Sequence, residues 1–171
     1  MCYNKSIKAK KIEIMMIIKV DEKNIFDAAR IHSISWQESH RTFCEREFVK
    51  LHTPEHQREY LLEKLKNGYN LFMLLDIEPV GIVSIKENLI EDLYVLPKMQ
   101  NKGYGTKLLE FACAKCNGVP TLWILENNVN AARLYRRMGF AETGRRQAIT
   151  ENLDEIEFIA HALAKFNDEK D

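Results

Sequence analysis

One loop constrains the fold of this chain more than any other segment, and it reads Gln100-Asn-Lys-Gly103-Tyr-Gly105-Thr106. It follows a segment with strand character that ends at Val95 and precedes a segment with helical spacing that begins near Tyr104. Two glycines let backbone N–H groups turn toward one point, and a helix N-terminus adds partial positive charge there. The sequence therefore predicts a strand-loop-helix unit that cradles an anion, most naturally a pyrophosphate.

Two common nucleotide-binding motifs fit this loop poorly. A dinucleotide fingerprint needs a third glycine where this chain has Leu108, and a Walker A loop needs Gly-Lys-Ser/Thr where the order is Gly105-Thr106-Lys107. A domain that binds NAD or ATP is therefore the weaker alternative. A glycine pair that only makes a tight strand-to-helix turn is the simplest one.

The hydrophobic pattern along the chain predicts alternating strands and helices. Their expected order is strand, two helices, three strands, helix, strand, helix, two strands. The expected strands are 11–20, 71–75, 80–85, 90–95, 121–125, 140–143 and 155–160. The expected helices begin at a cap at Asp21, at a cap at Thr53, near Tyr104 and at Asn130. Without a repeat or linker, we predict one α/β domain over residues 1–171, with a loose polar leader over 1–10.

Composition excludes several classes of protein. The chain has 171 residues, of which 46% are apolar, enough for the core of one globular domain. Its 25 basic and 25 acidic residues cancel, so net charge favours no nucleic-acid partner. The apolar run Ile14–Ile18 is too short to cross a membrane. We therefore expect a cytoplasmic protein that binds neither nucleic acid nor membrane.

The residues that bind metals do not gather in the sequence. Cys113 and Cys116 have no second ligand pair nearby, and His52 and His56 have no third ligand. We therefore expect no metal site.

Further blocks of sequence accompany the glycine loop. Leu93-Tyr-Val-Leu-Pro97 precedes it, Leu108-Leu109 follows it, and the pattern Asn128-x-x-Ala131-x-x-Leu134-Tyr135-x-x-x-Gly139-Phe140 comes later. Together, residues 71–143 resemble the GNAT superfamily of acetyl-CoA-dependent N-acetyltransferases. Between Lys5 and Gly68 only the order of elements agrees, and in this family that part shapes the acceptor pocket.

This resemblance implies a fold and a reaction. The implied fold is a single α/β (α+β) domain with a central mixed, mostly antiparallel sheet, splayed fourth and fifth strands and about four flanking helices. The implied reaction moves the acetyl group of acetyl-CoA to a small-molecule amine or a peptide N-terminus, without a metal. Dimers are common in this family, so a homodimer is one expectation, but the sequence shows no identifiable interface and leaves the oligomeric state open. A coenzyme A binding or regulatory module that transfers nothing is the alternative.

The resemblance also implies which residues bind the cofactor. The loop would bind the coenzyme A diphosphate through main-chain amides, and the strand before it would lie along the pantetheine arm. Asn128 would hold the pantetheine, although an Asn before a helix is also an N-cap signal. The expected cofactor-binding residues are Leu93, Tyr94, Val95, Gln100, Asn101, Lys102, Gly103, Tyr104, Gly105, Thr106 and Asn128.

Tyr135 matches the family tyrosine that protonates the leaving thiolate. An alkyl amine with a pKa near 10.4 must lose a proton before it attacks, so a base is also needed. Alternation along 90–95 puts Glu91 on the same face as Leu93 and Val95 and opposite Asp92. Family bases occur on the face of Glu91, which makes it the candidate, with Asp92 or a water chain as alternatives.

The acceptor side has weaker candidates. Trp36, Ser39 and His40 lie where the first inter-helix loop of the family borders the acceptor site. We expect these three residues to line the amine pocket, although a structural or surface role for His40 and a core role for Trp36 are the simpler alternatives.

Overall fold

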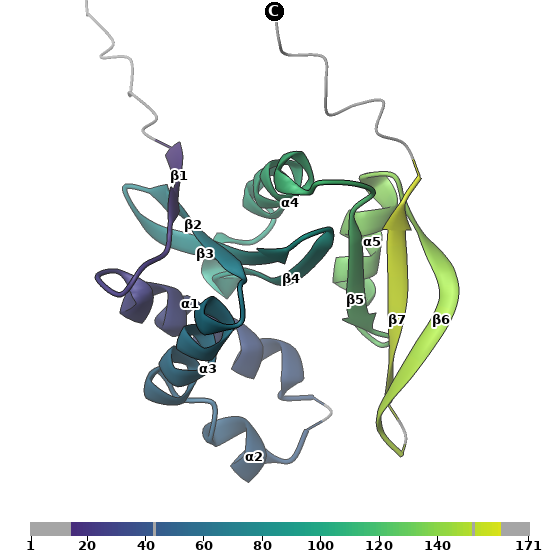
Figure 1. Ribbon diagram of the computed structural model, residues 1–171. Coiled ribbons are helices and arrows are strands. Elements are labelled where there is room, and N and C mark those ends of the chain that lie inside the picture. The colour runs from purple at the N-terminus through teal and green to yellow at the C-terminus, as the bar shows by residue number, and fades with distance from the viewer. Residues whose placement is uncertain (1–14, 43, 152, 162–171) are drawn as a thin grey trace, which may run out of the picture.

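A computed structural model describes residues 15–42, 44–151 and 153–161. The expected leader (1–10) and the start of the first expected strand, including Ile12 and Ile14, lie outside the described residues. Within these residues the chain forms a seven-stranded sheet with α-helices on both faces (Figure 1). The strands are β1 (Met15–Lys19), β2 (Asn70–Asp76), β3 (Glu78–Lys86), β4 (Leu89–Val95), β5 (Thr121–Leu125), β6 (Phe140–Thr150) and β7 (Leu153–Ala160). The helices are α1 (Ile25–His40), α2 (Arg46–Lys50), α3 (Pro54–Lys66), α4 (Tyr104–Lys115) and α5 (Val129–Arg137), and η1 (Pro97–Met99) is a 3₁₀ turn.

The sheet is mixed and mostly antiparallel, as predicted. Its strand order is β1-β2-β3-β4-β5-β7-β6, and β4 with β5 is the parallel pair among the described strands. These two strands pair only at Leu89 with Thr121 and at Ile90 with Leu122, after which they diverge (Figure 1). This confirms the predicted splay, which leaves the rest of β4 without a partner strand on that side.

Two apolar clusters hold the helices to the sheet. One joins the sheet to α4 and α5 and contains Leu108 and Tyr135. The other joins the sheet to α1 and α3 and contains Ile31 and Leu61, both fully buried. Figure 1 shows α1 and α3 on one side of β2–β4 and α4 on the other. Each face of the central strands is therefore covered by helices.

The local signals in the sequence were right at some helix ends and wrong at others. Thr53 caps α3 as predicted, because its hydroxyl accepts a hydrogen bond from the backbone N–H of His56 at 3.3 Å. The first helix begins after Asn24, not at the predicted cap Asp21. The short helix α2 was not predicted, and β6 runs to Thr150, well beyond the predicted end at 143.

β4 departs from strict alternation. Ile82 of β3 pairs with Tyr94, and Ser84 pairs with Glu91, so β4 carries one extra residue between these pairs. Asp92 lies in this β-bulge with a φ of 49°. The prediction that Glu91 and Asp92 lie on opposite faces is therefore wrong. The bulge turns both carboxylates toward α3.

Candidate active site

The glycine loop forms the predicted strand-to-helix turn at the start of α4. Gly103 has a φ of 89°, which favours glycine, and Asn101 also has a positive φ of 61°. Gln100 fixes the loop to the end of β4, since its side-chain amide donates to the carbonyl of Val95 at 3.1 Å. Several backbone N–H groups of the loop have no acceptor among the described residues, namely those of Asn101, Lys102, Gly103, Gly105 and Thr106. The loop therefore offers an anion a row of unfilled donors.

Basic side chains lie beside these donors. Arg137, at the end of α5, donates to the hydroxyl of Thr106 at 3.2 Å. Lys102 is exposed, with its ammonium 3.6 Å from the sulfur of Met99. The sequence analysis did not single out Arg137, because nothing in its spacing shows that the end of α5 reaches the loop. The two cations and the donor row suit a diphosphate.

The side chain of Tyr104 points inward. It is 7% exposed, and its hydroxyl donates to the carboxylate of Asp76 on β2. Tyr94 is also directed into the fold, where its ring meets that of His32 at 4.8 Å between centroids. For Tyr104, the main chain is therefore the part left to face a cofactor, whereas Tyr94 stays half-buried.

Asn128 acts as the N-cap of α5. Its side-chain oxygen accepts from the backbone N–H of Ala131 at 3.2 Å. The capping interpretation of Asn128 is therefore right, and a contact with pantetheine would fall to its amide nitrogen.

Tyr135 is a buried tyrosine whose hydroxyl has no hydrogen-bond partner among the residues described. The residue is 6% exposed and packs beside Phe140 and Phe158. Burial raises its pKa well above the usual value, and the nearby Cys113 adds to this effect. The phenol therefore keeps its proton at neutral pH, which leaves the hydroxyl available as a donor.

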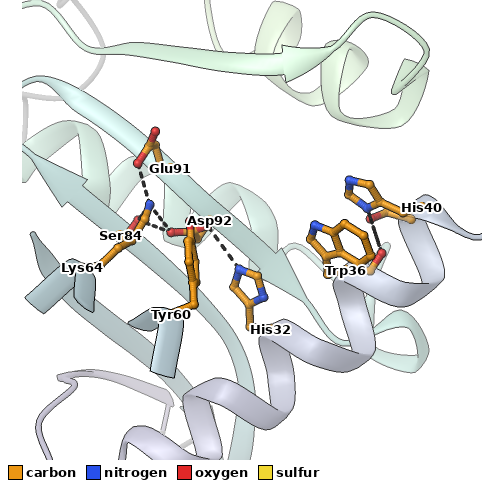
Figure 2. A network of polar contacts seen from close by, with 9 residues as sticks. His32, Trp36, His40, Tyr60, Lys64, Ser84, Glu91 and Asp92 are labelled. Atoms are coloured by element: carbon orange, nitrogen blue, oxygen red, sulfur yellow. Dashed lines mark hydrogen bonds and ion pairs between the residues drawn. The ribbon is translucent and has the colours of Figure 1, made fainter. Parts of the chain in front are cut away.

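Glu91 and Asp92 share one cation, the ammonium of Lys64 on α3 (Figure 2). The Nζ of Lys64 lies 2.5 Å from Oε2 of Glu91 and 2.6 Å from Oδ2 of Asp92. The side chain of Glu91 is 33% exposed, whereas that of Asp92 is 10% exposed. The two carboxylates are thus bound to the same group but differ in their access to solvent.

Asp92 is held by donors from three elements. His32 lies 3.2 Å away, Tyr60 donates at 3.1 Å, and Ser84 donates at 2.6 Å. Burial alone would raise the pKa of Asp92, but the contact with His32 and the charge of Lys64 together hold it well below its usual range. Asp92 is therefore poorly suited to accept a proton at neutral pH.

Trp36 is enclosed between two imidazole rings. The ring of His40 stacks on one face at 3.8 Å between centroids, and that of His52 stacks at 3.4 Å. The hydroxyl of Ser39 bonds to the carbonyl of Trp36 at 3.0 Å and meets Nδ1 of His40 at 2.8 Å. Figure 2 shows Trp36 and His40 along α1, apart from Glu91. The structure thus brings Trp36, Ser39 and His40 together, but it places Trp36 and His40 away from Glu91. The two imidazole rings stack on the indole of Trp36.

We expect the stability of the protein to fall between pH 7 and pH 5 partly through His40. Burial lowers the pKa of His40 to about 4, against the opposing effect of the Trp36 carbonyl. In this window the unfolded chain binds the proton and the folded chain does not, so the free energy of unfolding decreases as pH falls. His40 is partly exposed, so its contribution is small. In His40→Phe the free energy of unfolding, measured with urea, should fall by about 1 kcal/mol less between pH 7 and pH 5 than in the wild type. Equal pH dependence in both proteins would contradict this account.

Glu155 on β7 also escaped the sequence analysis. It pairs with Leu125 at the end of β5, where β5 has diverged from β4. Burial raises the pKa of Glu155, and the charge of Glu91 raises it further. No cation lies within ion-pair distance of Glu155 in the parts of the chain that the structure covers. Glu155 is therefore a second carboxylate near Glu91, without a salt bridge of its own.

Two further features are absent from the described residues. They contain no group of three His, Cys, Asp or Glu side chains placed to hold a metal ion. None of their helices combines the length and apolar character needed to span a membrane.

The comparisons with known proteins agree on the type of domain. Residues 67–142 match the model of the acetyltransferase (GNAT) domain family. An uncharacterized N-acetyltransferase of Archaeoglobus fulgidus is 27% identical over 136 residues, covering 71% of this chain and 89% of that protein. Peptidyl-lysine N-acetyltransferase YjaB of Salmonella typhimurium is 34% identical over 68 residues, covering 40% of this chain and 46% of that protein.

A solved structure extends the likeness to the whole sheet. The PaiA N-acetyltransferase of Thermoplasma acidophilum, in complex with coenzyme A, has a TM-score of 0.62 at 17% identity, covering 84% of this chain and 97% of that one. These matches confirm the resemblance predicted from residues 71–143, and they favour it over the NAD or ATP alternative.

Proposed function

Because the chain belongs to the GNAT superfamily of acetyl-CoA-dependent N-acetyltransferases, we propose that it acetylates a primary amine by direct attack, with Glu91 as base and Tyr135 as acid. One observation carries the proposal. The strands β4 and β5 part after Ile90, and β4 leads into a loop in which five backbone N–H groups have no acceptor among the described residues, those of Asn101, Lys102, Gly103, Gly105 and Thr106. A thioester with a diphosphate tail fits this combination, because the loop binds the tail and the opening receives the reactive end.

The chain's own residues have separate roles in this reaction. The amine gives up one proton to Glu91, directly or through water, and its nitrogen then attacks the thioester carbonyl. A C–N bond forms, the C–S bond breaks and the attacking nitrogen releases a second proton to solvent, which leaves the acetylated amine and a thiolate. Tyr135 donates to the sulfur, and solvent restores the proton of its hydroxyl. Main-chain N–H groups of β4 polarise the carbonyl oxygen.

Asp92 is not the base in this proposal. Its charge is already bound by Lys64, Ser84, Tyr60 and His32, whereas Glu91 is the more exposed carboxylate. Water molecules that relay the proton to Glu91 are compatible with this assignment.

The acceptor is a primary amine, and a lysine side chain in a peptide is the first class to test. The relative from Salmonella typhimurium is named for its action on peptidyl-lysine. Small-molecule amines and peptide N-termini, both expected from the sequence, belong in the same panel. The cytoplasmic location and the homodimer stay predictions.

A thiol-release assay tests the proposal. Acetyl-CoA is incubated with the protein and each acceptor, and the melting temperature with acetyl-CoA is recorded in the same samples. We expect thiol release that depends on one acceptor class. Stabilisation without release would instead indicate a coenzyme A binding or regulatory module, and the absence of both would reject the cofactor site.

Arg137 gives a separate test of the diphosphate site. Arg137→Gln removes a cation beside Thr106, so we expect the KM for acetyl-CoA to rise roughly 10-fold with kcat little changed. Arg136→Gln is the matched control, because Arg136 is adjacent in α5 but pairs with Glu142 on β6 at 2.5 Å. Equal KM values in the two variants would remove Arg137 from the site.

A further inference from the structure

Lys64 is a buried lysine that lies under the candidate base. The residue is 9% exposed, and lysines are seldom buried at this level unless paired. Its ammonium contacts Glu91 and Asp92 and also lies over the ring of Tyr69, 4.3 Å from the centroid. A hydrogen bond at 3.3 Å to the hydroxyl of Ser84 completes its surroundings. These contacts surround the ammonium and fix its position.

Asp92 anchors this ammonium. Burial alone would lower the pKa of Lys64, but the charge of Asp92 more than reverses this and holds it above the usual value. Asp92 is itself fixed by His32 of α1 and Tyr60 of α3. The charge of Lys64 is thus permanent at neutral pH and held in place by a counter-charge that is not offered to solvent.

Glu91 completes the chain of contacts at its more exposed end. Lys64 contacts its Oε2 at 2.5 Å, and burial together with the charge of Glu91 raises the pKa of Tyr69. Two other titratable groups interact electrostatically with these carboxylates. Tyr94 of β4 interacts with Asp92, and Glu155 of β7 interacts with Glu91. In Figure 2, Glu91 lies at the opposite end of the network from His32. A carboxylate held in this way keeps one orientation while a third of its side chain stays accessible.

We propose that Lys64 is a positioning residue that holds the carboxylate of Glu91 ready to receive the proton of the amine, with Asp92 as the counter-charge that keeps Lys64 in place. This role rests on the proposed function. Lys64 keeps its own proton throughout, and the proton from the amine ends on Glu91. The bulge in β4 lies at these two residues, and both carboxylates contact the same ammonium.

The test compares two variants. Lys64→Met alone leaves the charge of Asp92 buried and unpaired, so the informative variant is Lys64→Met/Asp92→Asn, which removes one charge of each sign. Asp92→Asn alone is the matched control, because the amide oxygen of asparagine can still accept from Lys64 and the cation beside Glu91 is kept. The measurements are kcat, the KM for acetyl-CoA, and kcat against pH with the acceptor found for the wild type.

We expect the double variant to have a kcat roughly 10-fold below that of Asp92→Asn, with the same KM and the same stabilisation by acetyl-CoA. A purely structural Lys64 would leave kcat equal in the two variants, or would raise the KM for acetyl-CoA as kcat falls, and either result would overturn the proposal. Absence of transfer by the wild type would reject the proposed function itself, and this role with it.

Discussion

Tyr135→Phe should lower kcat roughly 10- to 100-fold and leave the affinity for acetyl-CoA nearly unchanged. The hydroxyl has no hydrogen-bond partner among the described residues, and burial raises its pKa, so it is a protonated donor at neutral pH. The bond that it donates to the departing sulfur forms only as the thiolate develops. Its loss therefore affects the transition state more than the bound cofactor.

The same substitution should not weaken the fold. Phenylalanine fills the same space beside Phe140 and Phe158, and removing a hydroxyl that has no hydrogen-bond partner among the described residues costs little stability. Steady-state kinetics and the melting temperature check both points. A kcat equal to that of the wild type would remove Tyr135 from the reaction.

Glu91→Gln is the second change with a large expected effect. At neutral pH an amine with a pKa near 10.4 is protonated, and without a positioned base its proton must go to water. We expect kcat to fall roughly 100-fold. Glutamine retains a carbonyl oxygen that can accept from Lys64, so the network itself should persist.

The control for Glu91→Gln is Glu87→Gln. Glu87 is an exposed carboxylate at the turn just before β4, and its neutralisation should leave kcat and the pH profile as in the wild type. If Glu91→Gln behaves like this control, the proton leaves by another group or by water, and Glu155 is the next carboxylate to replace.

The sequence predicted correctly those features of the fold that depend on residues close together in the chain. The loop at 100–106 has its glycine at the position with positive φ, and Thr53 and Asn128 cap the helices that they precede. The splay of β4 from β5 came from the resemblance, because no residue pattern within either strand reports where their pairing stops.

The arrangement around Glu91 could not be predicted in the same way. A bulge depends on the register between β3 and β4, so period-2 alternation gave the wrong face for Asp92 relative to Glu91. Lys64 lies 27 residues before Glu91 in the chain, on a helix with charged residues at many positions. Nothing in that helix distinguishes the lysine that is buried from those that are solvated.

Intact-mass spectrometry of a lysine-containing peptide tests the central claim most directly. The peptide is incubated with acetyl-CoA and either the wild type or the Glu91→Gln variant, and its mass is followed with time. The account predicts that the wild type adds one acetyl group to the peptide while releasing one equivalent of thiol, and that the variant does so far more slowly. An unmodified peptide, with no other amine in the panel acetylated, would contradict it.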